Sequence, residues 1–183
     1  ANRDKDNDVV GLEPDAERAA AAADRGLSVV NSELTADFLT EHGPFDAIIL
    51  ADVIEHLPSP TAMVALAASG LKPNGLLFVS VPNVAHWSVR LNLLFGRFDY
   101  EEVGIMDATH LRWFTRRTLQ EFLEHCGLEV VAMTQSAGVT LPIYYRSVFR
   151  LIPQRLREFA IRGLARLLPT LFGCQHVVMA RKH

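Results

Sequence analysis

Apolar residues recur along the chain in short runs, which are separated by longer stretches with helical spacing. The runs are rich in Val, Ile and Leu, side chains that favour β-strands. Because strands that alternate with helices are typical of crossover units on a parallel sheet, the pattern predicts an α/β fold. We expect strands at residues 9–12, 27–30, 45–50, 76–81, 128–133 and 175–180.

Helix boundaries can be recognised between several of these runs. Asp15 can cap a helix that Gly26 stops, and Thr115 can cap a helix that Gly127 closes. The expected helical segments cover residues 16–25, 60–69 and 85–95, with a further helical insertion at about 141–171.

Two local patterns refine the expected sheet. The run at 45–50 is apolar on both faces, as a central parallel strand requires. The Lys-Pro-Asn-Gly sequence at 72–75 predicts a turn into the next strand. The length of 183 residues, with no repeat or linker, predicts a single domain over 1–183.

The composition narrows the class of protein. Apolar residues make up 49% of the chain and charged residues 21%, which is ordinary for a folded α/β protein. No run approaches the ~18 apolar residues of a membrane span and no signal peptide is recognised, so we expect a cytoplasmic protein. Cys126 and Cys174 lack partners at metal-site spacing, so we expect neither a disulfide nor a structural metal.

The charge is slightly negative overall and unevenly placed. A net charge of −3 argues against a nucleic-acid binder, although arginines crowd the last third of the chain. No nucleic acid is therefore expected among the partners.

Glu13 directly follows the first expected strand. An acidic residue at the carboxyl edge of an α/β sheet can accept hydrogen bonds from the ribose hydroxyls of a nucleotide-like ligand. It can equally be a solvated carboxylate favoured by the positive end of the following helix. The residue alone leaves both interpretations open.

An ordered set of motifs decides the context of Glu13. The sequence VVGLEPD is followed by SEL, FDAIILADVIEHL and LKPNGLLFVSVPN. Together these resemble the class I S-adenosylmethionine-dependent methyltransferase family over about residues 9–133, in particular its small-molecule branch. The resemblance implies a Rossmann-like sheet, mostly parallel, with the final strand antiparallel beside the strand at 76–81, and S-adenosylmethionine as cofactor.

The resemblance also implies roles for individual residues. Glu13 matches the acidic residue that binds both ribose hydroxyls. Glu33 and Leu34 match a pair that contacts the adenine, the carboxylate at its amino group and the apolar side chain against its ring. Ala51 and Asp52 match the strand end that lines the methionine moiety.

One part of the family pattern is not found in the chain. The family's first strand ends in a glycine-rich turn that lets the backbone approach the cofactor closely. Here the polar residues 1–8 lead directly into what resembles the second strand, so we expect an N-terminally truncated form of the fold.

Asp52, Glu55 and His56 share a face if their segment turns helically. The set is similar to one in ubiquinone-pathway O-methyltransferases that is associated with a divalent cation. The alternative is that Glu55 and His56 satisfy each other and the nearby backbone. We expect no metal, and we take His56 as a candidate catalytic residue.

The segment DATHLRWFT resembles a signature of bacterial methyltransferases found with sugar and cell-envelope pathways. Its His110 is the favoured general base or hydroxyl-orienting group, because imidazole titrates near neutrality. The alternative is a buried histidine that holds the loop to the domain. His86, after the strand at 76–81, is a weaker candidate.

Two other functions compete with methyl transfer. A nicotinamide-dependent short-chain reductase needs a lysine four residues after a catalytic tyrosine, and none follows Tyr100, Tyr144 or Tyr145 at that distance. A non-catalytic module that binds a partner or a membrane surface remains open. It is favoured by the missing glycine turn and the arginine-rich insertion.

The insertion has an amphipathic pattern. At ~100° per residue Arg155, Arg162 and Arg166 form one stripe, leucines fill the opposite arc, and Arg157 lies within that apolar arc, where its stem can snorkel. The pattern predicts peripheral contact of residues 142–172 with an anionic membrane, with solvated arginines over a packed leucine face as the alternative. We expect methyl transfer to an oxygen or nitrogen of a small molecule such as a glycan, lipid-linked sugar or quinone precursor.

Overall fold

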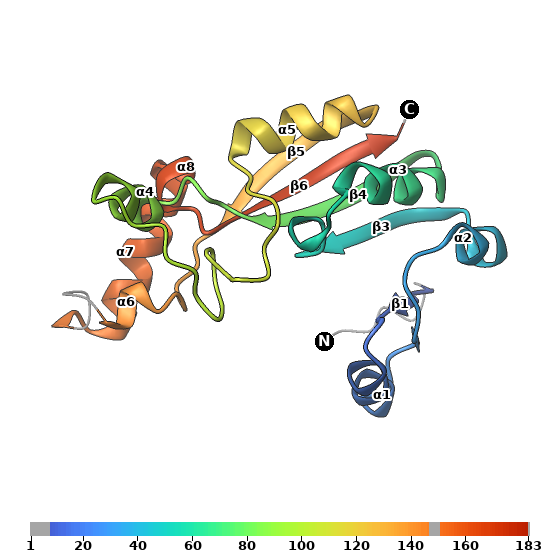
Figure 1. The fold of residues 1–183 in the computed structure, drawn as a ribbon, viewed down its shortest axis with the longest axis horizontal. Helices are drawn as coiled ribbons and strands as arrows, with labels where there is room; N and C mark the ends of the chain where they lie inside the picture. Colours follow the sequence, from blue (N-terminus) through green and yellow to red (C-terminus); the bar gives the residue numbers. More distant parts are fainter. Residues whose placement is uncertain (1–7, 147–150, 183) are drawn as a thin grey trace. The chain divides into compact units, whose positions relative to one another are not determined.

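The computed structural model describes residues 8–146 and 151–182, which divide between two compact units, Ala1–Gly43 and Pro44–His183. Each unit holds its own sheet, one of two strands and one of four (Figure 1). The predicted single domain over 1–183 stays a prediction.

The first unit is small and begins both of its helices with a side-chain cap. Asp15 accepts a hydrogen bond from the Arg18 amide and Thr35 accepts one from the Phe38 amide. Its two strands pair in parallel over only two residues each, so they are shorter than expected. The elements are β1 (Gly11–Leu12), α1 (Ala16–Asp24), β2 (Val29–Val30) and α2 (Ala36–His42).

The second unit contains a mixed sheet in the order β3-β4-β6-β5. β3 runs parallel to β4, whereas β6 lies antiparallel between β4 and β5. The predicted antiparallel last strand beside the strand at 76–81 is therefore confirmed. The strands are β3 (Phe45–Ala51), β4 (Leu71–Pro82), β5 (Leu128–Ser136) and β6 (Gln175–Lys182).

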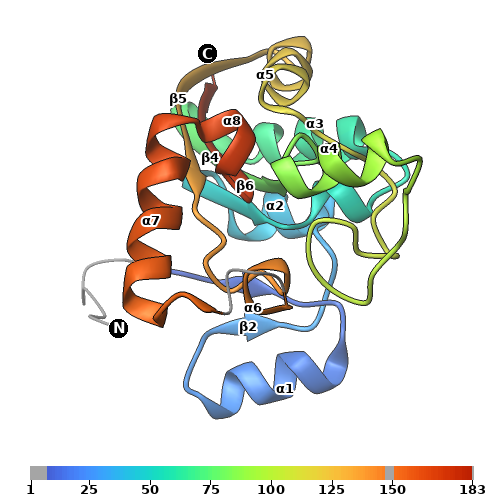
Figure 2. The ribbon, with the colours of Figure 1, turned by 90° about the vertical axis from the view of Figure 1, so that its left-hand side faces the viewer.

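Helices cover this sheet and enclose its core. α3 packs on β4, α5 on β5, and α7 on α8 and the end of β5 (Figure 2). Leu77, Val79 and Val178 are fully or almost fully buried beneath them. The helices are η1 (Ile54–His56, a 3₁₀ turn), α3 (Pro60–Ser69), α4 (Trp87–Leu94), α5 (Arg116–His125), α6 (Ile143–Arg146), α7 (Gln154–Leu167) and α8 (Pro169–Phe172).

One expectation about the strands is wrong. β3 is not buried on both faces: within the described four-stranded sheet it is an edge strand, and Ile49 is 70% exposed. The expected turn at 72–75 is present but lies inside β4, where these residues stand opposite Asp46 alone and Asn74 has a positive φ. Pairing of Leu71 with Phe45 extends the strand beyond that point.

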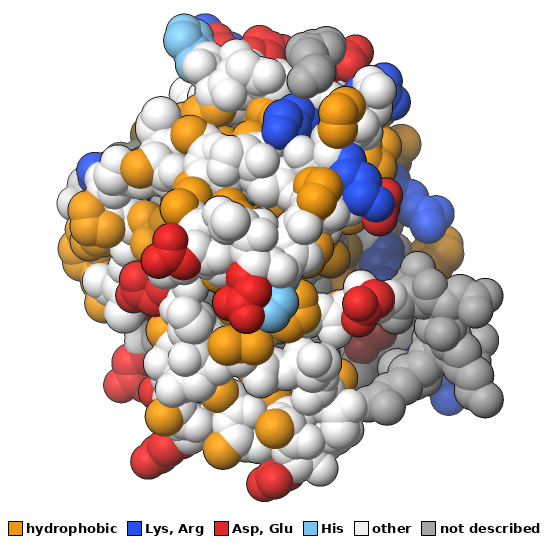
Figure 3. Space-filling model, turned by 90° about the vertical axis from the view of Figure 1, so that its right-hand side faces the viewer, with side chains coloured by type: hydrophobic (Ala, Val, Ile, Leu, Met, Phe, Trp, Pro, Cys, Tyr) orange, Lys and Arg blue, Asp and Glu red, His pale blue; other side chains and the backbone are white. Residues whose placement is uncertain are grey.

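The surface is mixed in character. The face in Figure 3 shows hydrophobic side chains in small groups among acidic and basic ones, as is usual for a folded protein. None of the described helices is long and apolar enough to cross a membrane.

Candidate functional site

In the first unit, Glu13 lies at the carboxyl end of β1. The side chain of Asn31, after β2, donates to the backbone oxygens of Glu13 and Pro14, at 2.9 and 2.8 Å. The two strand ends are therefore tied together. Glu13 Oε1 accepts from the Asp15 amide at 3.0 Å, and Oε2 has no hydrogen bond recorded within the described residues.

The adenine-pair candidates follow Asn31 on the same strand end. Glu33 is exposed and Leu34 is half-buried. A carboxylate in water beside a partly covered apolar side chain is compatible with an edge contact and a face contact to a flat ring.

In the second unit, the candidates gather where β3 and β4 end. Asp52 follows β3 with a positive φ of 53°, which is uncommon for a residue other than glycine. Gln175 Nε2 donates to both of its carboxylate oxygens at 2.8 Å, and Ser80 Oγ donates to Oδ1 at 3.2 Å. This network holds Asp52 in its strained conformation, while the neighbouring Ala51 is exposed.

The turn after Asp52 is pinned to the loop that carries His110. The backbone oxygen of Glu55 accepts from the amides of Leu111 and Arg112, at 2.8 and 3.0 Å. Ile105 and Met106, from the same loop, pack with Val89 in a buried cluster. The loop is therefore part of the site's rigid wall.

These segments enclose a cavity of about 250 Å³, which we call the histidine pocket. Asp52, His56 and His110 line it together, so the structure brings these three predicted residues into one site. Its lining is Asp52, Glu55, His56, Pro82, Gly104, Ile105, Asp107, His110, Cys174 and Gln175.

His110 has one ring nitrogen held and one available. Nδ1 lies 3.1 Å from the Ile105 carbonyl, which can only accept, so Nδ1 carries the proton and Nε2 the lone pair. His110 is 7% exposed, and burial lowers the pKa of its imidazole. A neutral imidazole can accept a proton at neutral pH.

His56 is oriented by a chain of hydrogen bonds. Thr109 Oγ1 donates to Asp107 Oδ1 at 2.6 Å and therefore accepts from His56 Nδ1 at 3.0 Å. The bond from Thr109 is the main cause that lowers the pKa of Asp107. The His56 and His110 rings meet edge to face, with centroids 4.8 Å apart.

Glu55 is fully buried beside the two histidines. Burial raises the pKa of its carboxyl to about 7, and the nearby Asp52 adds to the rise. Neither carboxyl oxygen has a hydrogen-bond partner in the described part of the chain. A buried carboxyl without partners is either protonated or awaits a cation or a donor from a ligand.

A divalent ion would fit a different set of ligands from the one considered in the sequence. Ligand atoms of Glu55, His56 and His110 lie within 4.8 Å of one another. Asp52 is already engaged by Gln175 and Ser80. One carboxylate and two imidazoles suit zinc-like ions better than magnesium.

Two further residues, His86 and Cys174, have burial and pKa shifts that are typical of a structural role. His86 is buried at the start of α4, where it contacts Ser88 and Tyr144, and burial lowers its pKa to about 4. Burial also raises the pKa of the Cys174 thiol to about 11, so the thiol stays protonated. Cys126 and Cys174 are both free cysteines.

The insertion differs from the expected helical wheel. Arg157 does not snorkel: it is buried, and its guanidinium carbon lies 4.3 Å from the centroid of the Tyr145 ring. The buried face of α7 instead includes Ile161 and Ala165. Large apolar side chains of the insertion point into solvent, namely Leu151, Leu156, Phe159, Leu167 and Leu168.

Residues 3–133 match a protein family described as "Methyltransferase domain". The chain belongs to this family. The predicted class I methyltransferase fold is thereby confirmed.

Sequence relatives of this domain also carry methyltransferase names. "Ubiquinone biosynthesis O-methyltransferase" of Rhodopseudomonas palustris (strain BisA53) is 27% identical over 135 residues, 72% of this chain and 52% of the relative. The chain spans about half the length of the curated relatives it matches.

Two solved structures share the fold. A SAM dependent methyltransferase from Archaeoglobus fulgidus has a TM-score of 0.57 and 19% identity, covering 94% of this chain and 75% of its own. The mycolic acid cyclopropane synthase complexed with SAH and CTAB has a TM-score of 0.57 and 16% identity, covering 96% and 70%.

Sequence reasoning missed several residues that position the site of this methyltransferase domain. Gln175 donates hydrogen bonds to Asp52, and Thr109 orients His56. Neither is a titratable group, so neither was considered as a candidate. An antiparallel last strand places its first residue opposite Pro82, at the same sheet edge as Asp52. That predicted pairing was the one feature of the sequence that could have placed Gln175 near Asp52.

Proposed function

We propose that the protein transfers a methyl group from S-adenosylmethionine to an oxygen or nitrogen of a small molecule. The observation that carries the proposal is the histidine pocket, where Asp52, His56 and His110 meet at the carboxyl ends of β3 and β4. Ligands of open α/β sheets bind at that edge.

The cofactor supplies an electrophilic methyl group on a positively charged sulfur. In the proposed reaction the acceptor's lone pair attacks the methyl carbon, and the carbon–sulfur bond breaks with its electrons on sulfur. The acceptor's proton passes to His110 Nε2, which holds a lone pair because Nδ1 is committed to Ile105. His56 is proposed to orient the acceptor hydroxyl or amine, and the rigid turn and loop supply positioning.

Roles in cofactor binding are proposed for residues of each unit taken by itself. Glu13 is assigned the ribose hydroxyls, Glu33 and Leu34 the adenine, and Ala51 and Asp52 the methionine moiety. The Glu13 assignment is supported by Oε2, which has no hydrogen bond recorded within the described residues and can accept one from a ligand.

The acceptor class is proposed to be a glycan, a lipid-linked sugar or a quinone-type precursor. The relatives named for ubiquinone biosynthesis support a small-molecule acceptor. We further propose that the protein works in the cytoplasm and that α7 contacts the inner face of an anionic membrane. Exposed Leu156 and Phe159 beside the exposed Arg155 support that contact.

The function is tested first at the cofactor. Glu13→Ala should weaken S-adenosylmethionine binding by about 1.5–3 kcal/mol, the range for charge-assisted hydrogen bonds, without unfolding the domain. Glu17→Ala is the matched control, since Glu17 is an exposed acid in the first turn of α1. Calorimetry on the full-length protein measures both affinities.

Two outcomes would contradict the proposal. Equal affinities of the Glu13 and Glu17 variants would remove Glu13 from the site. Absence of cofactor binding by the unmodified protein would overturn methyl transfer and favour a non-catalytic module.

A further inference from the structure

We propose that a hollow between α7 and the end of β5 binds a phosphate or diphosphate group of the methyl acceptor. We call it the arginine hollow. This inference rests on the proposed function, because it assigns a chemical class to the proposed methyl acceptor. Its lining is Thr134, Gln135, Ser136, Ala137, Arg162, Ala165, Arg166 and Pro169.

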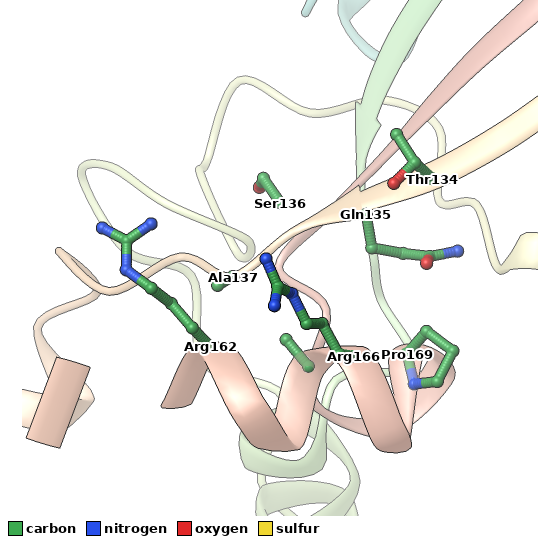
Figure 4. A pocket seen from close by; sticks show the side chains of 8 residues that line it. Thr134, Gln135, Ser136, Ala137, Arg162, Arg166 and Pro169 are labelled. Carbon is green, nitrogen blue, oxygen red and sulfur yellow. The ribbon is translucent and has the colours of Figure 1, made fainter. Parts of the chain in front are cut away.

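The arginine hollow is a defined recess in the second unit. Its volume is about 490 Å³, which is room for more than a single ion. Figure 4 shows Arg162 and Arg166 rising from α7 on the side of the β5 end, with the Arg166 guanidinium beside Ser136 and Ala137. The two arginines are four positions apart, so both project from one face of the helix.

Neither arginine has a counter-charge among the described residues. For Arg162 and Arg166 the structure records no hydrogen bond or ion pair with any described residue. No Asp or Glu is among the described residues that line the hollow. Two guanidinium groups without a counter-charge favour a ligand that is itself an anion, and arginine binds phosphate through paired N–H donors.

An unused donor in the wall points to the same kind of ligand. Gln135 Nε2 is buried and has no hydrogen-bond partner in the described part of the chain. A buried amide without a partner is destabilising unless water or a ligand supplies an acceptor. The hydroxyl of Thr134, also in the wall, adds a further donor.

The arginine hollow and the histidine pocket each share wall residues with a third recess, whose volume is about 430 Å³. This recess has Ser136, Ala137 and Arg162 in common with the hollow. It has Cys174 and Gln175 in common with the histidine pocket. In the order of these shared walls the three recesses form a row, with Asp52 and the histidines at one end and the arginines at the other.

The backbone shapes the middle of this row. Gly138 has a φ of +56°, and a Cβ there would lie 2.3 Å from Cys174 Cβ. Only glycine lets the chain after β5 pass this close to Cys174. The close approach of this segment to Cys174, which lines the middle recess, is therefore fixed by the backbone.

The division of charge along the row predicts the form of the acceptor. Its methyl-accepting atom lies beside His110, and its phosphate or diphosphate lies some distance away between Arg162 and Arg166. A soluble sugar phosphate and a lipid-linked sugar diphosphate share this chemistry.

Pyrophosphate titrated calorimetrically into the full-length protein, without cofactor, tests the site. Arg162→Gln and Arg166→Gln should each weaken binding about tenfold or more, because each removes a paired donor and a charge. Arg166→Lys should retain part of the affinity. Arg155→Gln is the matched control: Arg155 lies on the same helix but does not line the hollow, so affinity should change less than about twofold.

Equal losses in the Arg155 variant and the two hollow variants would overturn the proposal, because they would indicate unspecific attraction to a basic helix. Absence of pyrophosphate binding by the unmodified protein would also overturn it. Neither result would affect cofactor binding, which is measured separately. Conversely, pyrophosphate binding without cofactor binding would contradict methyl transfer, and with it the assignment of the phosphate to a methyl acceptor.

The two sources of phosphate are distinguished with vesicles that contain phosphatidylglycerol. If the hollow takes a lipid-linked group, pyrophosphate should displace the protein from such vesicles, and Arg166→Gln should abolish that displacement. If it takes a soluble phosphate, neither pyrophosphate nor Arg166→Gln should change binding to the vesicles.

Discussion

His110 combines two roles that are usually hard to separate. Its Nδ1 holds the loop through Ile105, whereas Nε2 faces the pocket without a recorded partner among the described residues. The sequence left a catalytic and a structural role as alternatives. The geometry is compatible with both at once, one for each ring nitrogen.

His110→Asn should separate them, since its amide can still donate to the Ile105 carbonyl but cannot act as a base. We expect turnover to fall by ~10²–10⁴ with cofactor affinity and melting temperature nearly unchanged. His110→Ala should lose stability as well. A variant His110→Asn that melts as wild type and keeps its specific activity would make His110 purely structural.

Glu55 should make stability depend on pH. Its folded pKa of about 7 exceeds the usual 4.5, so its stabilising contribution is full below about pH 4.5 and is lost as the pH rises through 7. Glu55→Gln should therefore gain stability relative to wild type by about 1–3 kcal/mol between about pH 5 and pH 8. Thermal unfolding at several pH values measures the difference.

The buried His86 and His176 act in the opposite direction. Burial lowers the pKa of each to about 4, so their contribution is present above about pH 6.5 and is lost as the pH falls through 4. This acid limb should be identical in wild type and Glu55→Gln. Glu102→Gln, at an exposed position, is the control and should leave the whole profile unchanged.

The sequence indicated which residues lie in the histidine pocket better than it indicated their hydrogen-bond partners. Asp52, His56 and His110 do meet, because strand ends and the following loops share one sheet edge. Their spacing in the sequence predicted that Asp52, Glu55 and His56 share one face of a helical turn. The left-handed backbone at Asp52 instead turns its carboxylate to Gln175, which no local pattern could indicate.

Among the elements, α7 departs furthest from its predicted orientation. A helical wheel identifies an apolar arc but not which part of it meets the sheet. Here Ile161 and Ala165 face inward, Arg157 stacks on Tyr145, and Leu156 and Phe159 remain in solvent. The predicted alternative of a fully packed leucine face is therefore wrong for the described part of the insertion.

The exposed apolar side chains of α7 give the membrane proposal a direct test. Leu156→Ser together with Phe159→Ser should sharply reduce co-sedimentation with anionic vesicles, because each buried side chain contributes ~1.5–3 kcal/mol. Arg155→Gln should have a smaller, salt-dependent effect of ~1 kcal/mol.

Leu27→Ser changes an equally exposed leucine outside the insertion and should leave sedimentation unchanged. Lack of sedimentation by the unmodified protein at low salt would reject membrane contact. The arginine hollow would be unaffected, since Leu156 and Phe159 do not line it.

Across the whole molecule, the order of elements was predictable and the extent of the sheets was not. Alternating strands and helices, Thr115 as a cap and Gly127 after its helix all follow from local sequence. Burial of a strand depends on what pairs with it. Ile48 and Ile49 are apolar and were expected to be buried in the core. In the described four-stranded sheet, however, β3 pairs with β4 alone.

The position of β6 has a consequence for the synthesis of the chain. Among the described strands of this sheet it is made last, yet it lies between β4 and β5 and supplies every sheet bond that joins them. A ribosome must therefore release residues 175–182 before the edges of β4 and β5 are satisfied. Until then the unpaired N–H and C=O groups along β4 and β5 stay open to wrong partners, so this unit depends on late, non-local pairing for its final fold.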